Sequence, residues 1–350
     1  MAGTEPNIPA ASWGVVATAA EPAPLLVAFA AHHLDRGARR VHLYLDRPNP
    51  AFRAMVGADD RIVITDATRG FFRGELGRGR PKTITRRQIA LANHALAVTD
   101  ADWLIHLDAD EFLGQGDPAA ELAALPAHVL GLHIPNGERV FVDGAPTTSI
   151  LDGPIALPIR NRRALERLRG AEVARFSATG LLAHALGKSA LRARQGPIAG
   201  IHWPRTEKAQ RAAAQSLRIS HFDGVTRLHW ALKIRRHIAN GVLDVPVYGT
   251  GALRHTLLAH VRDHTGSLDE VLALHDRLRL LPRPIARRLR RRGWLSGSGV
   301  DAGGAIARQF PGLETDLSPD AFDAQLADLA KPDTVRRSQP RKRAHPADEL

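Results

Sequence analysis

The stretch WLIHLDADEFL, residues 103–113, decides how the rest of the sequence is interpreted. An apolar run broken by a single histidine ends in three acids, Asp108, Asp110 and Glu111. Such a run predicts a buried strand, and ligands of open α/β sheets bind beyond the carboxyl ends of the strands. Because Asp108 and Asp110 are two residues apart, an extended chain points both carboxylates the same way. Two converging carboxylates repel each other unless a cation lies near them.

Carboxylate oxygens suit Mg²⁺ or Mn²⁺, which usually keep water molecules and take further ligands from substrate phosphates. The acidic cluster therefore predicts a divalent cation that holds a diphosphate. The competing interpretation is an acidic turn that caps the following helix, as Asp and Glu commonly do. The apolar strand before the cluster and Phe112 after it favour the ligand site.

Apolar strands alternate with helices on the N-terminal side of this stretch. The predicted strands are residues 13–18, 41–45 and 61–65, and the predicted helices are residues 22–34, 51–56 and 86–98. Strands separated by helices favour right-handed crossovers and a largely parallel sheet. Residues 66–83 are rich in Gly and Arg and predict a long mobile loop.

The predicted secondary structure changes twice after the acidic cluster. A helix (117–125) and a strand (128–134) come first, turn-rich segments occupy residues 135–201, and residues 223–290 return to helical spacing. We expect four parts in the whole chain. They are a flexible N-terminus (1–12), an α/β catalytic domain (13–222), a helical C-terminal region (223–330) and a disordered basic tail (331–350).

The composition argues against several classes of protein. None of the 350 residues is Cys, so a disulfide framework, a thiolate metal site and a cysteine nucleophile are excluded. No run approaches the ~20 apolar residues of a membrane helix. The N-terminus lacks the basic and apolar regions of a secretory signal, so we expect a cytoplasmic protein. The net charge of +12 points to anionic partners, but an aromatic content of 5% disfavours base stacking, and we expect no nucleic acid.

The arginines concentrate in residues 277–292, which read RLRLLPRPIARRLRRR. Pro282 and Pro284 forbid one long helix through this segment, but residues 285–292 predict a short helix. Apolar residues beside dense arginines suit an anionic membrane surface, and they predict peripheral contact with the inner face of the cytoplasmic membrane. The alternative is a solvated, arginine-rich helix packed against the catalytic domain.

The segment QIALANHALAVTDADWLIHLDADEFL, residues 88–113, resembles the nucleotide-sugar segment of bacterial family-two-like glycosyltransferases, close to the family ninety-two group. The matching positions are Gln88, Asp102, Trp103, Asp108, Asp110, Glu111 and Phe112. Residues 23–46 are similar to the first helix and second strand of the family. Three later stretches follow in the family's order: ERVFVDG (138–144), GKSALRARQGPIAGIHWP (187–204) and ISHFDGVTRLHWALKIRR (219–236). The resemblance covers about residues 13–240.

The chain departs from the family at two turns. The family often carries an Asn-Glu pair before its first helix, where this chain has Glu21 and Pro22. The turn after the second strand reads DRPN, and only its Asp46 is carried over from the family.

The resemblance implies a GT-A fold, which is a Rossmann-like α/β fold, and metal-dependent transfer of a sugar. The implied donor is a UDP- or GDP-sugar, and the implied acceptor is a glycan or a lipid-linked molecule, as in polysaccharide biosynthesis. The residues implied for donor binding are Thr18, Asp46, Gln88, Asp108 and Lys188. The implied ligands of Mn²⁺ or Mg²⁺ are Asp108, Asp110 and His221. An inverting transferase also needs a carboxylate base, and the candidates are Glu138, Asp143 and Asp223.

Two other functions remain open. A haloacid-dehalogenase-type phosphatase also places D-x-D after an apolar strand, but it does so in its first strand and has Thr or Val where this chain has Phe112. The third possibility is a non-catalytic protein that binds a membrane or nucleic acid through residues 277–292. Salt-sensitive binding without nucleotide-sugar binding would favour it.

Overall fold

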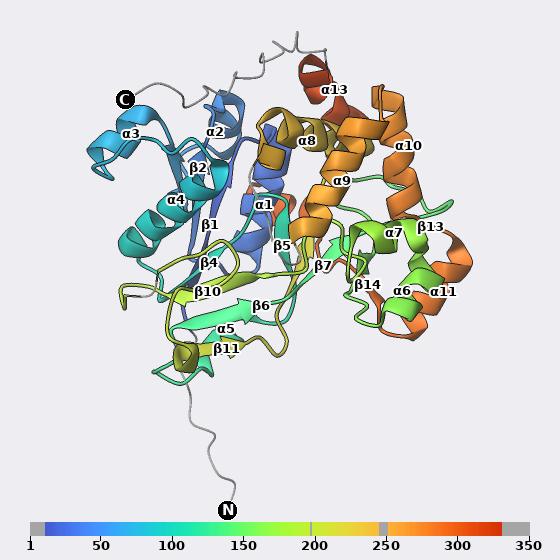
Figure 1. Cartoon of the computed structure of the whole chain (residues 1–350). Coiled ribbons are helices and arrows are strands. Elements are labelled where there is room, and N and C mark those ends of the chain that lie inside the picture. Colours follow the sequence, from blue (N-terminus) through green and yellow to red (C-terminus); the bar gives the residue numbers. More distant parts are fainter. Residues whose placement is uncertain (1–10, 197, 245–250, 331–350) are drawn as a thin grey trace, which may run out of the picture.

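The computed structural model describes residues 11–196, 198–244 and 251–330 (Figure 1). Most of the predicted flexible N-terminus (1–12) and all of the predicted basic tail (331–350) lie outside the described residues. Within the described part, no helix combines the length and the apolar character needed to cross a membrane.

The first sheet has seven strands in the order β11-β6-β10-β4-β1-β2-β3. Strands β3, β2, β1 and β4 are parallel neighbours, and β10 runs antiparallel to both β4 and β6. The strands are β1 (Trp13–Ala19), β2 (Arg40–Leu45), β3 (Ile62–Asp66), β4 (Trp103–His106), β6 (Gly131–Ile134), β10 (Lys188–Arg192) and β11 (Arg211–Ala213). The predicted α/β fold with a mostly parallel sheet is confirmed.

Helices cover both faces of this sheet (Figure 1). Successive residues of a strand face opposite sides, so Val15 of β1 packs with helix α1 (Ala23–Asp35), while Val16 packs with helix α4 (Ile84–Val98). Helix α12 (Ala302–Gln309), from far along the chain, packs against α1. A strand buried on both faces needs a continuous apolar run, which is what the sequence of β1 provides. Helices α2 (Pro50–Val56) and α5 (Pro118–Ala123) match their predicted positions.

A second sheet of five strands begins where the first one ends. Its order is β14-β9-β7-β12-β5. The strands are β5 (Glu111–Gln115), β7 (Asn136–Arg139), β9 (Ile155–Ala156), β12 (Arg218–His221) and β14 (Leu295–Ser296). Because β5 follows β4 after only four residues, the segment 107–110 links the two sheets. The acidic cluster therefore lies at their junction.

The helices of the C-terminal half pack around a separate apolar core. It contains Trp230 of α8, Leu257 of α9, Leu274 of α10 and Leu289 of α11, all with less than 1% of their surface exposed. These helices are α8 (Arg227–Ala239), α9 (Gly251–His264), α10 (Leu268–Arg279) and α11 (Arg283–Arg291). Helices α6 (Arg162–Arg169) and α7 (Ala171–Phe176) belong to the same core although they come earlier in the chain. The predicted boundary at residue 222 therefore does not coincide with the division between the cores.

The remaining elements are short or lie at the periphery. Strand β13 (Leu280–Leu281) pairs with β8 (Phe141–Val142), and helix α13 (Pro319–Ala330) places the buried Phe322 against His229 of α8. Two turns of 3-10 helix cover Lys208–Gln210 and Val242–Asp244. Helix α10 ends at Arg279 and α11 begins at Arg283, so the predicted break at the prolines is confirmed.

The structure corrects the prediction of one long loop at residues 66–83. Helix α3 (Arg69–Gly74) forms inside it, because the hydroxyl of Thr68 accepts a hydrogen bond from the Phe71 amide and the side chain of Phe72 is fully buried. Arg80, near the end of the stretch, donates to the carbonyl of Ala67. The cap at Thr68 and the buried side chain of Phe72 hold this stretch in place, and the Gly and Arg content of the sequence indicates neither of them.

Candidate functional site

Asp108 lies beyond the carboxyl end of β4 and is held from two sides. Gln88 of α4 donates to one carboxylate oxygen at 2.6 Å, and the ammonium of Lys188 donates to the other at 2.8 Å. Lys188 reaches this place because β10 runs antiparallel to β4 with Ser189 opposite His106, so that Lys188 lies just beyond the end of β4. Burial opposes the charge of Asp108, but Lys188 outweighs it and holds the pKa of the Asp108 carboxyl well below its usual range.

Glu111 is a fully buried carboxylate beside Asp108. One oxygen accepts a hydrogen bond of 2.8 Å from the backbone amide of Asp108 and lies 3.4 Å from the ammonium of Lys188. The other oxygen lies 3.3 Å from Nε2 of His184 and has no hydrogen bond within the described part of the chain. Burial raises and Lys188 lowers the pKa of Glu111, and the net change is downward. Glu111 is therefore a buried anion with one oxygen still free to accept.

Asp110 contacts His221 and Lys233 of the chain's later part rather than the partners of Asp108. The premise of an extended chain through these residues was wrong, because a turn closes with a 3.0 Å hydrogen bond from the Glu111 amide to the Asp108 carbonyl. One oxygen of Asp110 lies 2.5 Å from the ammonium of Lys233, and the other lies 3.7 Å from Nε2 of His221. The two acids of the D-x-D motif thus face different sets of partners.

His221 reaches Asp110 through the pairing of the second sheet. Strand β12 runs antiparallel to β5 with His221 opposite Glu111, and the amide of Phe222 donates to the carbonyl of Asp110 at 2.8 Å. Burial disfavours a charged imidazole, but the adjacent Asp110 outweighs it and raises the pKa of His221 to about 9. The structure therefore brings the predicted residues Asp110 and His221 together.

Two of the three predicted catalytic bases are locked in ion pairs. Asp223 contacts Lys233 at 3.0 Å and Arg279 at 2.8 Å, and Arg279 also lies 2.7 Å from Glu138. Burial opposes the charge of Asp223, but these cations hold the pKa of its carboxyl well below the usual range. The carboxylate of Asp223 is therefore a weak base. Glu138 is held by Arg279, so neither acid is free to contact an acceptor hydroxyl while the pairs hold.

Asp143, the third predicted base, lies apart from these groups. It is exposed next to β8, where its backbone amide donates to the carbonyl of Leu281 and its own carbonyl accepts from Arg283. No contact among the described residues joins its carboxylate to the acidic cluster of Asp108, Asp110 and Glu111, which we call the D-x-D cluster.

Two overlapping groups of side chains have the donor atoms of a metal site. Asp110, His221 and Asp223 form one, and Glu111, His184 and His221 form the other, with the ligand atoms of each group within 4.8 Å of one another. The second group also holds buried atoms without hydrogen bonds in the described part, namely one oxygen of Glu111, both ring nitrogens of His184 and Nδ1 of His221. Carboxylate and imidazole donors with unsatisfied atoms fit a divalent cation. Neither group includes Asp108.

The remaining donor-binding predictions, Thr18 and Asp46, lie near the ends of β1 and β2. The hydroxyl of Thr18 is buried without a partner in the described part. The carboxylate of Asp46 accepts hydrogen bonds from Arg80 at 2.7 Å and from Arg87 at 2.8 and 2.9 Å. Beyond these strand ends a hollow of about 260 Å³ is lined by residues that include Glu21, Arg47 and Asn49.

The site contains residues that the sequence prediction missed. Lys233 was not among the predicted site residues, but only 15% of its side chain is exposed, and it bridges Asp110 and Asp223. Its helix α8 also directs His229 to Glu21 at 2.9 Å and Arg236 to Glu21 at 3.7 Å. The spacing of residues 229, 233 and 236 is the repeat of one helix face, and this was the available signal.

Comparisons with known proteins give a limited result. No family model and no curated protein matches the sequence. The structure is similar to that of mannosyl-3-phosphoglycerate synthase from Rubrobacter xylanophilus, with 13% identity, 82% of this chain and 76% of that chain covered, and a TM-score of 0.33. It is also similar to glucosyl-3-phosphoglycerate synthase from Mycobacterium tuberculosis, solved with Mg²⁺ and uridine diphosphate, with 14% identity, 65% of each chain covered and a TM-score of 0.27. Similarity at this level does not establish an activity, so the functional argument rests on the site itself.

Proposed function

We propose that this protein is a glycosyltransferase that uses a nucleotide-diphosphate sugar as donor and a divalent cation, Mn²⁺ or Mg²⁺. The observation that carries the proposal is the divergence of the two acids at the sheet junction. Asp108 faces the cations and amides of the first sheet, while Asp110 faces His221 and the helical region. An ion held on the Asp110 side would thus lie beyond the carboxyl end of β4 in the parallel part of the sheet, where α/β proteins bind nucleotides.

Asp110 and His221 are the residues that would hold the ion, with Asp223 as the third protein ligand. The alternative set is Glu111, His184 and His221. When bound, the cation would neutralise charge on the departing nucleoside diphosphate. Asp108 was also predicted as a ligand, and its position 2.8 Å from Lys188 favours a part in donor binding instead.

Lys188 and Gln88 support the donor side of the proposal. The ammonium of Lys188 is fully buried between Asp108 and Glu111, and these carboxylates raise its pKa against the effect of burial, so it stays charged. Lys188 offsets part of the negative charge of these two acids, which lessens their repulsion of a diphosphate, and Gln88 fixes the rotamer of Asp108. In this proposal Asp46 and Thr18 line the nucleoside end, with Arg80 and Arg87 holding Asp46 in position.

The acceptor is proposed from the resemblance alone, as a glycan or a lipid-linked molecule. Peripheral contact with an anionic membrane through residues 277–292 would bring the enzyme to a lipid-linked acceptor, and α11 does present exposed arginines. The phosphatase alternative gains no support, because the motif follows the fourth strand along the chain rather than the first.

A thermal-shift panel of UDP- and GDP-sugars, each with and without Mn²⁺ or Mg²⁺, tests the proposal. A ligand at 100 times its Kd stabilises the folded state by about 2.7 kcal/mol, so a true donor raises Tm clearly. We expect the largest rise for one nucleotide sugar together with a metal. Asp110→Asn should lose the metal-dependent part of that rise. The proposal fails if no nucleotide sugar raises Tm with either metal.

A further inference from the structure

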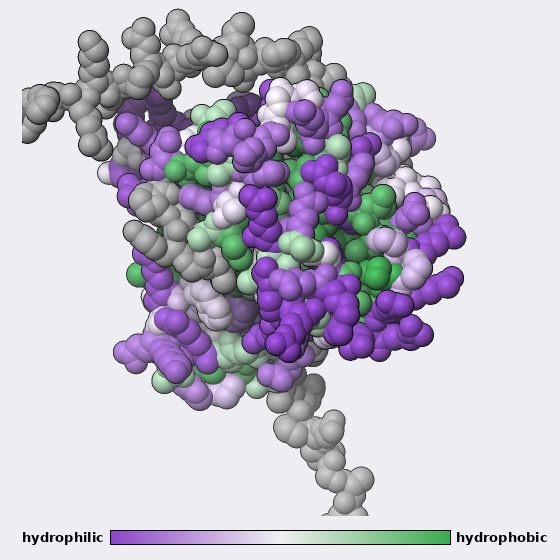
Figure 2. All heavy atoms as spheres, turned by 45° about the vertical axis from the view of Figure 1, so that its right-hand side comes forward, coloured by the Kyte–Doolittle hydropathy of each residue, from purple (hydrophilic) through white to green (hydrophobic). Residues whose placement is uncertain are grey.

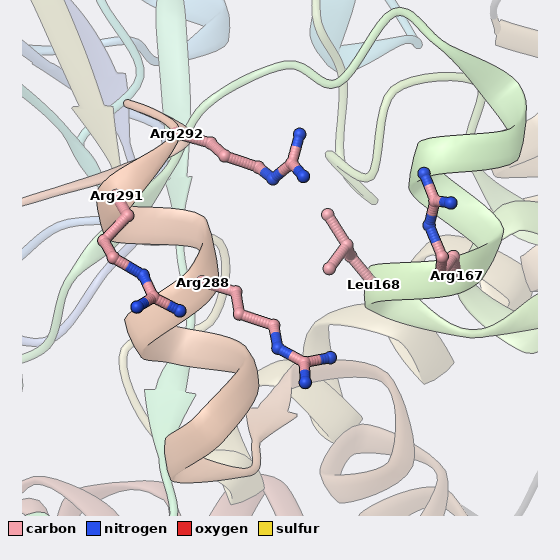
Figure 3. A pocket seen from close by; sticks show the side chains of 5 residues that line it. All are labelled: Arg167, Leu168, Arg288, Arg291 and Arg292. Atoms are coloured by element: carbon pink, nitrogen blue, oxygen red, sulfur yellow. The ribbon is translucent and has the colours of Figure 1, made fainter.

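A pocket lined by four arginines lies between α6 and α11, at the far side of the helical region (Figure 1). Its volume is about 520 Å³, and its lining residues are Arg167, Leu168, Arg288, Arg291 and Arg292. Figure 3 shows Arg288 of α11 and Arg292, the residue that follows α11, reaching towards α6, where Arg167 and Leu168 lie across the gap. We call this the arginine pocket. Two segments that are distant in the sequence thus contribute arginines to the lining of one hollow.

None of these four arginines has a carboxylate within ion-pair distance in the described part of the chain, whereas neighbouring arginines do find partners. Arg162 of α6 pairs with Glu166 at 2.7 Å, and Arg277 of α10 pairs with Glu172 at 3.2 Å. Arg283, at the start of α11, donates to the backbone carbonyls of Asp143 and Gly144. The positive charge of the arginine pocket is therefore not neutralised locally.

The sequence explains why no partner is at hand. No acidic residue stands between Asp276 and Asp301, and that interval contains all of α11. Leu289 is fully buried under the helix, which fixes the face that α11 turns outwards. Hydrophilic residues gather on this side of the molecule in Figure 2. Positive charges that the fold holds close together repel one another, and an anion bound between them offsets this electrostatic repulsion.

We propose that the arginine pocket binds a phosphate-bearing anion. Guanidinium groups present several donors in a planar fork that matches phosphate oxygens, and several of them around one hollow can surround a phosphate or diphosphate. Leu168 gives the pocket an apolar wall on the α6 side. The phosphate can belong to a soluble molecule or to a lipid headgroup. This inference does not depend on the proposed transferase activity, because the lining residues are separate from the D-x-D cluster.

The structure provides a matched control within α11. Arg288 and Arg291 line the pocket, whereas Arg287 and Arg290 are also exposed on the same helix but do not line it. The double variants R288Q/R291Q and R287Q/R290Q remove the same charge from the same helix. If an anion binds in the pocket, the two double variants should weaken binding to different extents. If it binds to a diffuse basic surface, they should weaken binding equally.

The first experiment titrates inorganic pyrophosphate into the full chain by calorimetry, in low salt with EDTA. We expect R288Q/R291Q to weaken binding by about tenfold or more, since each charge-assisted hydrogen bond contributes well above a neutral one. R287Q/R290Q should change it by no more than about twofold, through long-range charge alone. Thermal denaturation of both variants checks that the fold is kept. Equal weakening by the two variants, or no binding by the wild type, would overturn the proposal.

A second arm identifies the source of the phosphate. Flotation with phosphatidylcholine vesicles, with and without phosphatidylglycerol, measures binding to a lipid surface. The pocket binds a lipid headgroup if the wild type binds the anionic vesicles, if pyrophosphate releases it from them, and if R288Q/R291Q does not bind them. If pyrophosphate binds in the pocket and the vesicles do not bind, the ligand is soluble. Loss of nucleotide-sugar binding at the D-x-D cluster would leave both results unchanged.

Discussion

The D-x-D cluster and the arginine pocket differ in whether their charged side chains have partners of opposite charge. At and beside the cluster, the acids Asp108, Asp110 and Asp223 are each matched by a buried or half-buried lysine or arginine of the same chain. At the arginine pocket, exposed arginines face one another without a carboxylate among the described residues. Burial explains the difference, because an unpaired charge in the interior is costly, whereas water tolerates it at the surface.

The difference determines what a ligand must do at each place. A cation entering the D-x-D cluster has to compete with Lys233, whose ammonium already lies 2.5 Å from Asp110 and 3.0 Å from Asp223. An anion entering the arginine pocket supplies the charge that the chain lacks there. According to the two proposals, ligand binding would exchange one positive charge for another in the first region and would add a negative charge in the second.

The largest effect on stability is expected where a buried pair is broken. Arg279→Met leaves the buried Glu138 without its cation, which should lower the free energy of unfolding by about 3–5 kcal/mol. Arg277→Met, on the same helix, breaks an exposed pair with Glu172 and should cost about 1 kcal/mol at most. Urea denaturation measures both. Similar losses for the two variants would show that burial does not separate these charges.

The next effect concerns activity. Asp110→Asn removes the charge that faces both His221 and Lys233, and we expect transfer to fall by roughly 100-fold or more while the fold is kept. Initial rates with the donor found by thermal shift measure this. Asp117→Asn serves as the control, since asparagine also caps a helix such as α5. Near-normal, metal-dependent turnover by Asp110→Asn would remove Asp110 from the site.

A smaller effect should reveal the competition at Lys233. Lys233→Met removes the ammonium between Asp110 and Asp223, so Mn²⁺ should bind about tenfold more tightly, which corresponds to ~1.4 kcal/mol. Calorimetric titration of the nucleotide-free protein with Mn²⁺ measures this without reference to activity. Weaker Mn²⁺ binding by Lys233→Met would mean that the lysine supports the cation site instead of competing for it.

The smallest effect is expected at the arginine pocket. R288Q/R291Q removes two exposed charges that have no partner in the described part, so the free energy of unfolding should change by no more than about 0.5 kcal/mol. Relief of repulsion would make any change a stabilisation. Urea denaturation beside R287Q/R290Q checks this. A large loss of stability would show that these arginines hold the fold together, and the contrast between the two regions would disappear.

Local patterns in the sequence determined the order of elements up to β4, apart from helix α3. Apolar runs marked β1 to β4 as buried strands, helical spacing marked α1, α2 and α4, and the D-x-D acids were placed correctly at a strand end. Pro282 and Pro284 predicted the break before α11 for a purely covalent reason. These features depend on residues close together in the chain, whose periodicity reports which side is buried.

Only the tertiary structure decided which charges meet. Lys233 lies 123 residues from Asp110, and Arg279 lies 140 residues from the carbonyl of Arg139 that it also binds. Their encounter depends on the register of β12 against β5 and on the packing of α8 and α10 around Trp230, which no local pattern records. The turn at Asp110 likewise separates two acids whose spacing suggested a shared direction. The sequence by itself therefore located the acids, and long-range packing selected the partner of each, because an ion pair depends on distance in space and not on separation along the chain.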